Sequence, residues 1–402
     1  MTDAERAPWL TIVGWGESGI SGLSAASRRA LDEADLIYGA RRHLSVLPAM
    51  NAEVREWPVP FAEGIPLLLA ERGRRVVMLV SGDPFWFGAG ASLARHLSRD
   101  EWEALPSPSA FSLAASRLGW SLEDCTCLGL HAKPLNRIRP SVQPGRRLLV
   151  LIRDGDAVAE LAKKLSQWGF GDTTMHVLES LGGERERVRS AAADGELPLD
   201  IAHPVAVGLA IRGTGAAIPS TPGLPDHFFE HDGQITKQTL RAMTLSALAP
   251  QAGERLWDIG TGSGSVAIEW LLAHPQNQAV AFERSSERAA RARRNAEALG
   301  VDWLDVIEGA VPAVLSDQSQ PDAVFIGGGL SDNLLAMLWE RLPSGTRLVA
   351  NAVTLESETL LAQWQASRGG ELLRLELSHA APIGTRRGWK ASYPIVQWRV
   401  TR

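Results

Sequence analysis

Two glycine-rich loops, one in each half of the chain, directly follow apolar runs that resemble buried strands. The first is LTIVGWGESGISG, residues 10–22, and the second is RLWDIGTGSG, residues 255–264. Glycines at such a turn let the backbone pass close to a ligand, and the following helix offers its first N–H groups to it. This pattern favours NAD, a nucleotide or S-adenosylmethionine as the ligand; a tight turn that binds nothing is the alternative.

The strands after the second loop also end in small or acidic residues. Glu283 ends the next strand, where a carboxylate can accept hydrogen bonds from both ribose hydroxyls, a solvated strand-end carboxylate being the alternative. The following strand ends in EGA, which places Gly309 and Ala310 where an adenine ring would lie, and FIGGG places Gly327 and Gly328 close to ligand or substrate. In this half we expect the cofactor to contact Gly260, Thr261, Gly262, Ser263, Gly264, Glu283, Gly309 and Ala310.

The first loop has comparable companions in its own half. Gly14 and Gly16 belong to the loop, and Gly82 and Asp83 lie in SGDPFWFGAG, directly after the apolar run VVMLV. Asp83 is either a cleft residue or a residue that stabilises a turn. Ser109 opens PSPSAFSLAASRLGW, where it can also cap a helix. We expect all five residues near a cofactor.

The elements that position these residues alternate between strands and helices, which predicts an α/β fold with mostly parallel sheets. The Gly/Pro/Ser/Thr-rich run at 213–225 is the best candidate for a linker, so we expect domains at 1–212 and 226–402. The second half is typical of a Rossmann-like, doubly wound sheet. Its last two strands, 372–377 and 395–400, have no helix between them and should be antiparallel.

Composition narrows the class of protein. The 402 residues are 45% hydrophobic and 22% charged, with a net charge of −5 and two cysteines. The negative balance argues against a nucleic-acid partner. We expect no membrane span, no secretory signal and a cytoplasmic location with reduced thiols. Cys125 and Cys127 lack a second ligand pair, so we expect no metal site.

The second half resembles the class I S-adenosylmethionine-dependent methyltransferases through DIGTGSG, FER, EGA and DAVFIGGG. The lead-in GLPDHFFEHDGQITKQTLR is similar to that of the precorrin methyltransferase/decarboxylase family of cobalamin biosynthesis. The resemblance implies that Thr236 helps to bind the cofactor; the residue is alternatively a helix N-cap. Glu283 stands where that family often has Asp, which adds one methylene of reach.

The first half resembles the tetrapyrrole methyltransferase family, in which two α/β subdomains hold the cofactor between them. The resemblance rests on the three motifs above together with ESLGGERERVR, residues 179–189, which is similar to the C5-methylating members. Family members commonly have G-x-G-P-G in the first loop. Here Glu17 stands in place of Pro and Ser18 follows, so the cofactor contact at this loop should differ.

Together the halves resemble a fused, decarboxylating precorrin methyltransferase. This resemblance implies methylation of a metal-free precorrin at C5 by the first domain, and methylation at C15 with decarboxylation of the C12 acetate by the second, giving precorrin-8X. It also implies one S-adenosylmethionine per domain and a homo-oligomer. The alternatives are a first domain that only binds or delivers tetrapyrrole, a methyltransferase acting on RNA or another small molecule, and a dehydrogenase.

The substrate implied by the resemblance carries many carboxylates, and its decarboxylation needs a proton. Cationic side chains should therefore line the cleft, and Arg386 and Arg387 are our candidates in the second domain, a solvated basic hairpin being the alternative. His231, Asp232 and His379 are candidates for the proton donor, although each could be an ordinary exposed residue.

Overall fold

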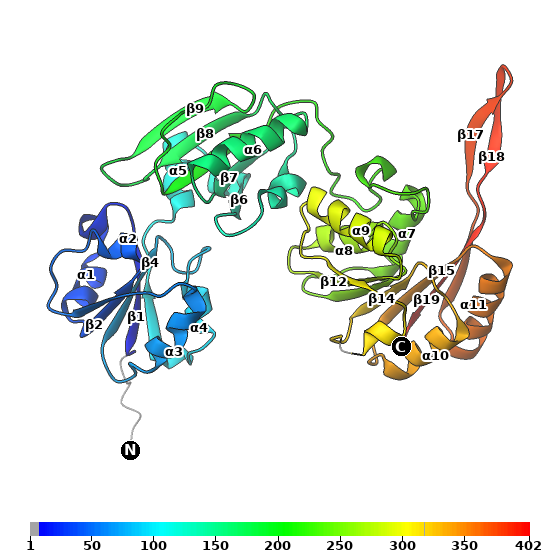
Figure 1. The fold of residues 1–402 in the computed structure, drawn as a ribbon, viewed down its shortest axis with the longest axis horizontal. Helices are drawn as coiled ribbons and strands as arrows, with labels where there is room; N and C mark the ends of the chain where they lie inside the picture. Colours follow the sequence, from blue (N-terminus) through cyan, green and yellow to red (C-terminus); the bar gives the residue numbers. More distant parts are fainter. Residues whose placement is uncertain (1–7, 317) are drawn as a thin grey trace. The chain divides into compact units, whose positions relative to one another are not determined.

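The structure is a computed structural model that describes residues 8–316 and 318–402, and these residues form two compact units. The first unit contains the residues up to Leu135 and Ser141–Ala216; the second contains Asn136–Pro140 and Ala217–Arg402. Both mix helices with strands, so the expected α/β class is confirmed (Figure 1). Among the described helices, none has the length and apolar character that crossing a bilayer requires.

The first unit begins with a five-stranded sheet, ordered β3-β2-β4-β1-β5, in which all neighbours are parallel. Its strands are β1 (Leu10–Trp15), β2 (Leu36–Gly39), β3 (Glu53–Glu56), β4 (Val76–Ser81) and β5 (Trp102–Leu105), and its helices are α1 (Ala25–Asp32), α2 (Arg41–Leu44), α3 (Gly64–Leu69) and α4 (Gly90–Ala94). Successive residues of β1 pack into different hydrophobic clusters, Ile12 into one and Val13 into the other. The sheet is thus covered on both faces, as parallel sheets require.

A second five-stranded sheet follows in the same unit, in the order β6-β7-β10-β8-β9. Its strands are β6 (Cys125–Gly129), β7 (Arg147–Leu151), β8 (Thr174–Glu179), β9 (Arg187–Ala192) and β10 (Val205–Ala210), with helices α5 (Ala110–Leu118) and α6 (Gly155–Gln167). Only the β6–β7 pair is parallel, because β10 and β9 run antiparallel to their neighbours. The expectation of mostly parallel sheets therefore holds for the first sheet and is wrong for this one.

The second unit contains a seven-stranded sheet, ordered β13-β12-β11-β14-β15-β19-β16. Its strands are β11 (Arg255–Ile259), β12 (Gln278–Glu283), β13 (Asp305–Glu308), β14 (Ala323–Ile326), β15 (Arg347–Ala352), β16 (Glu371–Leu375) and β19 (Ile395–Thr401), and its helices are α7 (Gln238–Leu248), α8 (Ser265–Ala273), α9 (Ser286–Ala298), α10 (Asp332–Arg341) and α11 (Leu355–Arg368). The first five strands are parallel, and β19 is antiparallel to both β15 and β16. The predicted antiparallel ending is confirmed.

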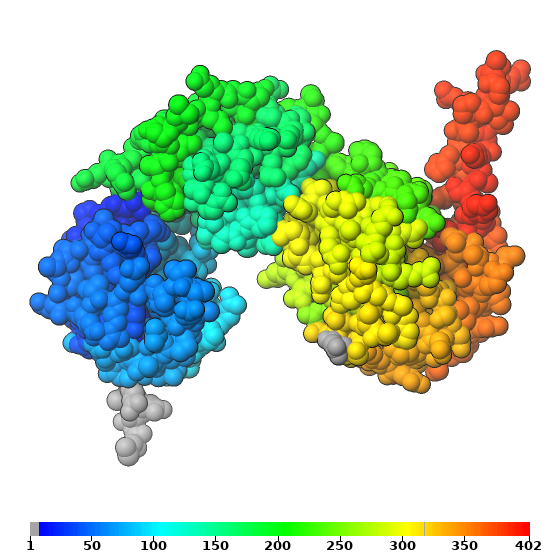
Figure 2. Space-filling model, in the orientation of Figure 1, coloured from blue at the N-terminus to red at the C-terminus, as the bar shows by residue number. Residues whose placement is uncertain are grey.

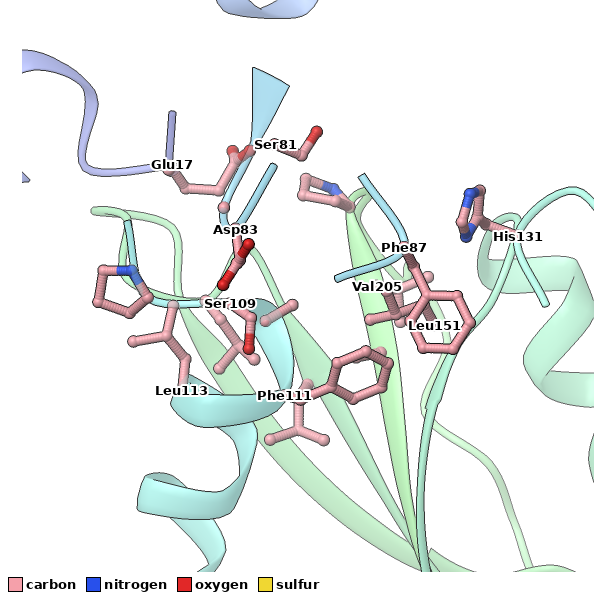
Figure 3. A pocket seen from close by; sticks show the side chains of 18 of the residues that line it. Glu17, Ser81, Asp83, Phe87, Ser109, Phe111, Leu113, His131, Leu151 and Val205 are labelled. Atoms are coloured by element: carbon pink, nitrogen blue, oxygen red, sulfur yellow. The ribbon is translucent and has the colours of Figure 1, made fainter. Parts of the chain in front are cut away.

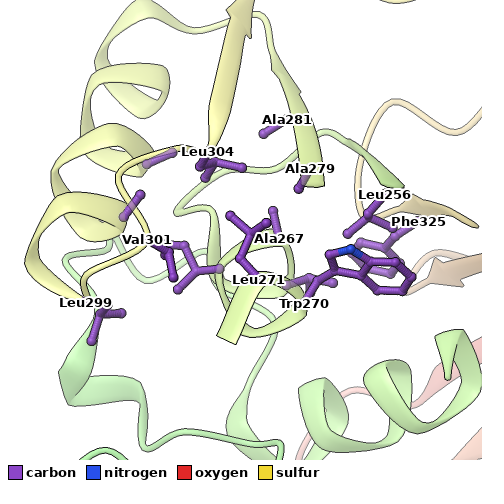
Figure 4. Close-up of a cluster of buried hydrophobic side chains, with 14 of the residues drawn as sticks. Leu256, Ala267, Trp270, Leu271, Ala279, Ala281, Leu299, Val301, Leu304 and Phe325 are labelled. Carbon is purple, nitrogen blue, oxygen red and sulfur yellow. The ribbon is translucent and has the colours of Figure 1, made fainter. Parts of the chain in front are cut away.

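Helices cover both faces of this sheet, and alternate strand residues supply two separate cores. Leu256 packs with α7, α8 and α9, whereas Trp257 packs with α10 and α11. Figure 4 shows part of the first core, where the fully buried Trp270 of α8 lies beside Leu256 and Phe325. A strand with a core on each face has no side in contact with solvent, so its sequence is a continuous run of apolar residues.

Ile218 and Leu224, within the linker expected at 213–225, are also buried in the first core. The linker and domain limits themselves stay predictions.

A two-stranded ribbon interrupts the sequence between β16 and β19. It consists of β17 (Ser378–Ile383) and β18 (Arg386–Ala391), which pair with each other and with no other described strand. Figures 1 and 2 show the ribbon projecting from the rest of its unit. The ribbon matches the alternative interpretation of Arg386 and Arg387, a solvated basic hairpin, because both residues lie exposed on β18.

A buried ion pair holds the lead-in to the second glycine loop. The Arg241 side chain of α7 is 0% exposed, and its Nε donates to Glu269 of α8 at 2.5 Å. Glu269 also accepts the N–H groups of Gly223 (2.6 Å) and Leu224 (2.9 Å), and Arg241 donates to the carbonyls of Leu224 and Thr236. The pair therefore fixes the segment that carries Thr236. Thr236, the alternative N-cap of the helix that follows, does not cap it, because α7 begins at Gln238 and its N-cap is Lys237.

In the first unit, a histidine is buried behind the end of β4. His43 of α2 is 4% exposed, and its Nε2 lies 3.3 Å from Ser81 Oγ. Burial, together with the positive charge of Arg42, lowers the pKa of His43 from 6.5 to about 4. The imidazole is consequently neutral at pH 7 in the folded protein.

Replacing Arg241 by Met should strongly destabilise the second unit, because it leaves the Glu269 carboxylate buried without its counter-ion. We expect a loss of about 3–5 kcal/mol in the free energy of unfolding. Urea denaturation with hydrogen-exchange mass spectrometry of peptides from α7 and α8 would measure it. Arg294→Met is the matched control, because Arg294 forms an exposed pair with Glu230 whose loss should cost less than about 1 kcal/mol. Equal losses in the two variants would contradict the assignment.

His43 should make the first unit less stable in mild acid. The unfolded chain binds a proton at His43 near pH 6.5 and the folded unit only near pH 4, so the stabilisation is present above pH 6.5 and is lost as the pH falls toward 4. The change is about 3 kcal/mol. The stability difference between the wild type and His43→Gln, measured by urea denaturation with hydrogen exchange at pH 7.5, 5.5 and 4.5, should shrink accordingly. A difference that stays constant with pH would contradict this account.

Candidate functional sites

The second glycine loop connects β11 to α8 through three left-handed residues. Gly260, Gly262 and Gly264 have φ values of +71°, +59° and +80°. A Cβ on Gly260 would lie 2.7 Å from the backbone nitrogen of Gly328, so the loop packs directly on the glycine run that ends β14. Any larger residue would separate the two strand ends, which explains why the approach needs glycine.

Glu283, at the end of β12, faces this loop. Its side chain accepts the N–H of Gly262 through Oε2 (3.0 Å) and the N–H of Ser285 through Oε1 (3.0 Å), and it is 6% exposed. A carboxylate has about four acceptor positions, so two remain for a ligand. Glu283 thus both orients the glycine loop and retains the capacity to accept hydrogen bonds from ribose hydroxyls.

Asp258 supports the loop from within the sheet. Its Oδ2 accepts the Thr261 hydroxyl (2.6 Å) and the N–H of Ala267 (3.1 Å). Burial, assisted by the nearby negative charge of Glu283, raises the pKa of Asp258 to about 6, while the two hydrogen bonds oppose this shift. The residue therefore links the turn to the first helical turn of α8 and does not enter the cavity.

A cavity of about 860 Å³ opens at these strand ends. Of the residues predicted from the sequence, it is lined by Thr236, Gly260, Thr261, Gly262, Glu283, Gly309, Ala310, Gly327 and Gly328. Ser263 and Gly264 lie beneath it, in the buried turn. The side chains of Lys237, Arg284, Arg288 and Asn351, which the sequence did not single out, also line it. Lys237 and Arg284 are exposed and bring positive charge to its wall.

Five predicted residues lie outside the lining of this cavity. His231 and Asp232 belong to an exposed turn, His379 lies on β17, and Arg386 and Arg387 lie on β18. The Gln234 N–H and the guanidinium groups of Arg291 and Arg288 hold the pKa of Asp232 at about 2, so this carboxyl carries no proton to donate near neutral pH. None of the five is on the cavity wall, although Asp232 accepts hydrogen bonds from Gln234 and Arg288, which do line it.

In the first unit, a cavity of about 340 Å³ lies at the carboxyl ends of β1 and β4. The predicted residues Gly16, Gly82, Asp83 and Ser109 line it, and Gly14 does not. A Cβ on Gly14 would lie 2.1 Å from the carbonyl oxygen of Gly82, so Gly14 serves the packing of the two strand ends. Figure 3 shows the polar side chains of Glu17, Ser81 and Asp83 toward one side of this cavity and the rings of Phe87 and Phe111 toward the other.

Two of these predicted residues also have local structural roles. Asp83 Oδ1 accepts the N–H of Phe85 at 2.8 Å, which forms the turn, and Ser109 caps α5 by accepting the N–H of Ser112 at 3.1 Å. Both interactions leave the residues on the cavity wall. Turn, cap and cavity functions are therefore compatible here.

Glu17, the departure from the G-x-G-P-G pattern, has a charged partner. Its Oε1 accepts from Arg42 of α2 at 3.0 Å, and the same guanidinium donates to the Ser81 hydroxyl. Burial lowers the pKa of Arg42 and the charge of Glu17 opposes this shift. Arg42, His131 and His203 line the cavity without any sequence signal, since each comes from a segment outside the four motifs.

Comparisons with known protein families agree with this division of the chain. Residues 10–194 match the model of the tetrapyrrole (corrin/porphyrin) methylases, and residues 227–402 match the model of the precorrin methyltransferase domain. The two matches cover separately the two halves that contain the two cavities.

Curated relatives match along nearly the whole chain. The precorrin-6Y C(5,15)-methyltransferase [decarboxylating] of a Sinorhizobium species is 47% identical over 98% of this chain and 97% of its own. The protein of the same name from Mycobacterium tuberculosis H37Rv is 39% identical over 98% of this chain and 100% of its own. A solved structure of the C-terminal domain of precorrin-6Y C5,15-methyltransferase from Rhodobacter capsulatus is 50% identical and covers 46% of this chain and all of that domain, with a TM-score of 0.45. The chain belongs to the family of decarboxylating precorrin-6Y C(5,15)-methyltransferases.

Proposed function

We propose that this chain transfers two methyl groups from S-adenosylmethionine to C5 and C15 of a precorrin. In this proposal it also removes the carboxyl group of the C12 acetate, giving precorrin-8X in the metal-free route to cobalamin. The observation that carries the proposal is the presence of two separate cavities, each lined by strand-end residues that the sequence pattern assigns to a cofactor. The family's name supports both ring positions and the decarboxylation.

We assign methylation at C15 and the decarboxylation to the second unit. Glu283 would accept the ribose hydroxyls, and the loop at Gly260–Gly264 would pass beneath the cofactor. The transferred carbon of a sulfonium is already electrophilic, and the meso carbon of a reduced macrocycle is electron-rich. Holding the two carbons in line therefore supplies much of the catalysis, with little acid–base assistance in forming the bond.

We assign methylation at C5 to the first unit, with its own S-adenosylmethionine at Gly16, Gly82, Asp83 and Ser109. The Glu17–Arg42 pair supports this assignment, because it gives the altered loop a defined position beside the cavity. The alternative, in which this unit only binds or delivers tetrapyrrole, differs in the number of cofactors bound per chain.

Decarboxylation replaces a carboxymethyl group by a methyl group, releases carbon dioxide and consumes one proton. The conjugated macrocycle can hold the electron pair of the broken carbon–carbon bond until that proton arrives. Asp232 is a poor donor because its pKa is about 2. His231 and His379 stay predictions as donors, as do Arg386 and Arg387 as contacts for substrate carboxylates. The cytoplasmic location, the homo-oligomer and the absence of a nucleic-acid partner also stay predictions.

If each unit holds a cofactor, isothermal titration calorimetry should find two molecules of S-adenosylmethionine per chain. Glu283→Ala should weaken one of the two sites at least about 100-fold, because it removes charge-assisted hydrogen bonds to the ribose and to the Gly262 N–H. Glu287→Ala is the matched control, since the Glu287 side chain is 81% exposed and pairs only with Arg291 among the described contacts. A single site in the wild type would favour the delivery alternative; two intact sites in Glu283→Ala would contradict the assigned ribose contact.

The reaction itself can be tested by mass spectrometry of the reduced precorrin after incubation with enzyme and isotopically labelled S-adenosylmethionine. We expect the gain of two labelled methyl groups and the loss of one carbon dioxide. One methyl group with loss of carbon dioxide would point to a first unit without catalytic activity. Two cofactors bound with an unchanged substrate would show that the proposed substrate is wrong.

A further inference from the structure

Three consecutive aromatic side chains follow the Asp83–Pro84 turn in the first unit. Phe85, Trp86 and Phe87 are 45%, 38% and 44% exposed. Trp86 and Phe87 line the 340 Å³ cavity, whereas Phe85 does not. Aromatic side chains carry large apolar areas that proteins usually bury. Two such rings left partly in water on the wall of a ligand cavity indicate that a ligand covers them.

The backbone holds these rings in place at an energetic cost. Phe87 has a φ of +58°, a conformation that bulky residues rarely adopt and that persists only where the surroundings enforce it. Gly88 and Gly90 close the loop tightly, because a Cβ on either would lie within 2.7 Å of the Pro84 carbonyl oxygen. The Phe87 ring lies over Gly129, the last residue of β6, where a Cβ would come within 2.5 Å of the ring. The ring position therefore depends on glycines in two distant segments.

Both rings rest on a third aromatic side chain. The Phe111 ring of α5 is 1% exposed, and its centroid lies 5.4 Å from that of Trp86 and 5.7 Å from that of Phe87. Figure 3 shows Phe87 and Phe111 in the same part of the cavity wall. The buried ring fixes the two exposed ones from behind, so they form a firm apolar wall.

The same cavity also contains hydrogen-bond donors. The Arg42 guanidinium, paired with Glu17, lies on its polar side, and the imidazoles of His131 and His203, whose pKa values burial lowers, line it as well. A flat conjugated ligand with acidic side chains fits a wall of this kind, since its face can stack on aromatic rings and its carboxylates can accept hydrogen bonds from these groups.

We propose that Trp86 and Phe87 form the surface on which the face of the tetrapyrrole macrocycle stacks in the first unit. This inference rests on the proposed function, in which that unit binds a tetrapyrrole. The adenine ring of the cofactor is the other flat group present in the reaction. The macrocycle is favoured because two rings, not one, are left partly exposed, and a macrocycle is larger than a single purine ring.

Uroporphyrin III, a flat conjugated tetrapyrrole with carboxylate side chains, is a suitable probe for the full-length chain. Its binding would be followed by absorbance, and that of S-adenosylmethionine by calorimetry. We expect two porphyrin sites per chain. Trp86→Leu and Phe87→Leu should each weaken one site about tenfold, as loss of a stacking partner does elsewhere, and leave cofactor affinity within about twofold. Phe85→Leu is the matched control from the same loop and should change neither affinity by more than about twofold.

Gly129→Ala tests the position of the ring without removing it, because the new Cβ displaces Phe87 from its seat. It should weaken porphyrin binding as much as Phe87→Leu does. Circular dichroism would verify that Gly129→Ala folds. If it does not fold, Trp86→Leu and Phe87→Leu alone test whether the two rings bind the porphyrin.

Two porphyrin sites that keep their affinities in Trp86→Leu and Phe87→Leu would overturn the inference. So would a selective loss of cofactor affinity, which would assign the rings to adenine. A single porphyrin site in the wild type, unaffected by every variant, would instead show that the first unit binds no tetrapyrrole, and the proposed function of that unit would then fail.

Discussion

Parallel strands place all of their carboxyl ends along one edge of a sheet, and both candidate sites depend on this constraint. In the second unit, β11, β12, β13 and β14 are neighbours in register, so residues separated by almost seventy positions in the sequence reach one cavity. In the first unit, β1 and β4 are adjacent, and the residues after both strands meet in the same way. These strand ends require glycine, because the backbones of Gly260 and Gly14 lie so close to other backbone segments that a side chain would not fit.

Buried polar groups then fix the segments that approach these edges from outside the sheets. Arg241 and Glu269 join the lead-in segment to α7 and α8. Backbone groups of Gly223, Leu224 and Thr236 and the carboxylate of Asp226 use their remaining hydrogen-bonding capacity. Asp258 serves the glycine loop similarly, through Thr261. Such groups are costly to bury without partners, so each one specifies a single local arrangement. The cavity of the second unit is therefore lined on one side by packed strand ends and on another by residues 234–237, which follow a segment that a charge pair holds in place.

The first loop shows how a departure from a family pattern is accommodated. A proline in the usual position would restrict the backbone conformation of the loop through its ring. Here an ion pair between Glu17 and Arg42 restricts the loop instead. Arg42 also contacts Ser81 at the end of β4, beside the buried His43. The loop is thereby connected to the neighbouring strand by side chains, and Glu17 lies on the opposite side of the cavity from the rings of Phe87 and Phe111 (Figure 3).

The sequence by itself determined the α/β class, the two glycine loops and the antiparallel ending of the second sheet, because strand–helix alternation and glycine spacing are local properties. It also pointed to Glu283 and Asp83, which line the cavities, since the first ends a buried strand and the second lies two residues after one. It could not determine that Lys237, Arg42 and His203 reach the cavities, or that Phe87 lies over Gly129, because those contacts join segments with no common pattern. The projecting ribbon that carries Arg386 was likewise decided by tertiary structure: its two strands pair with each other and with no other described strand, and local pattern does not reveal which sheet a strand joins.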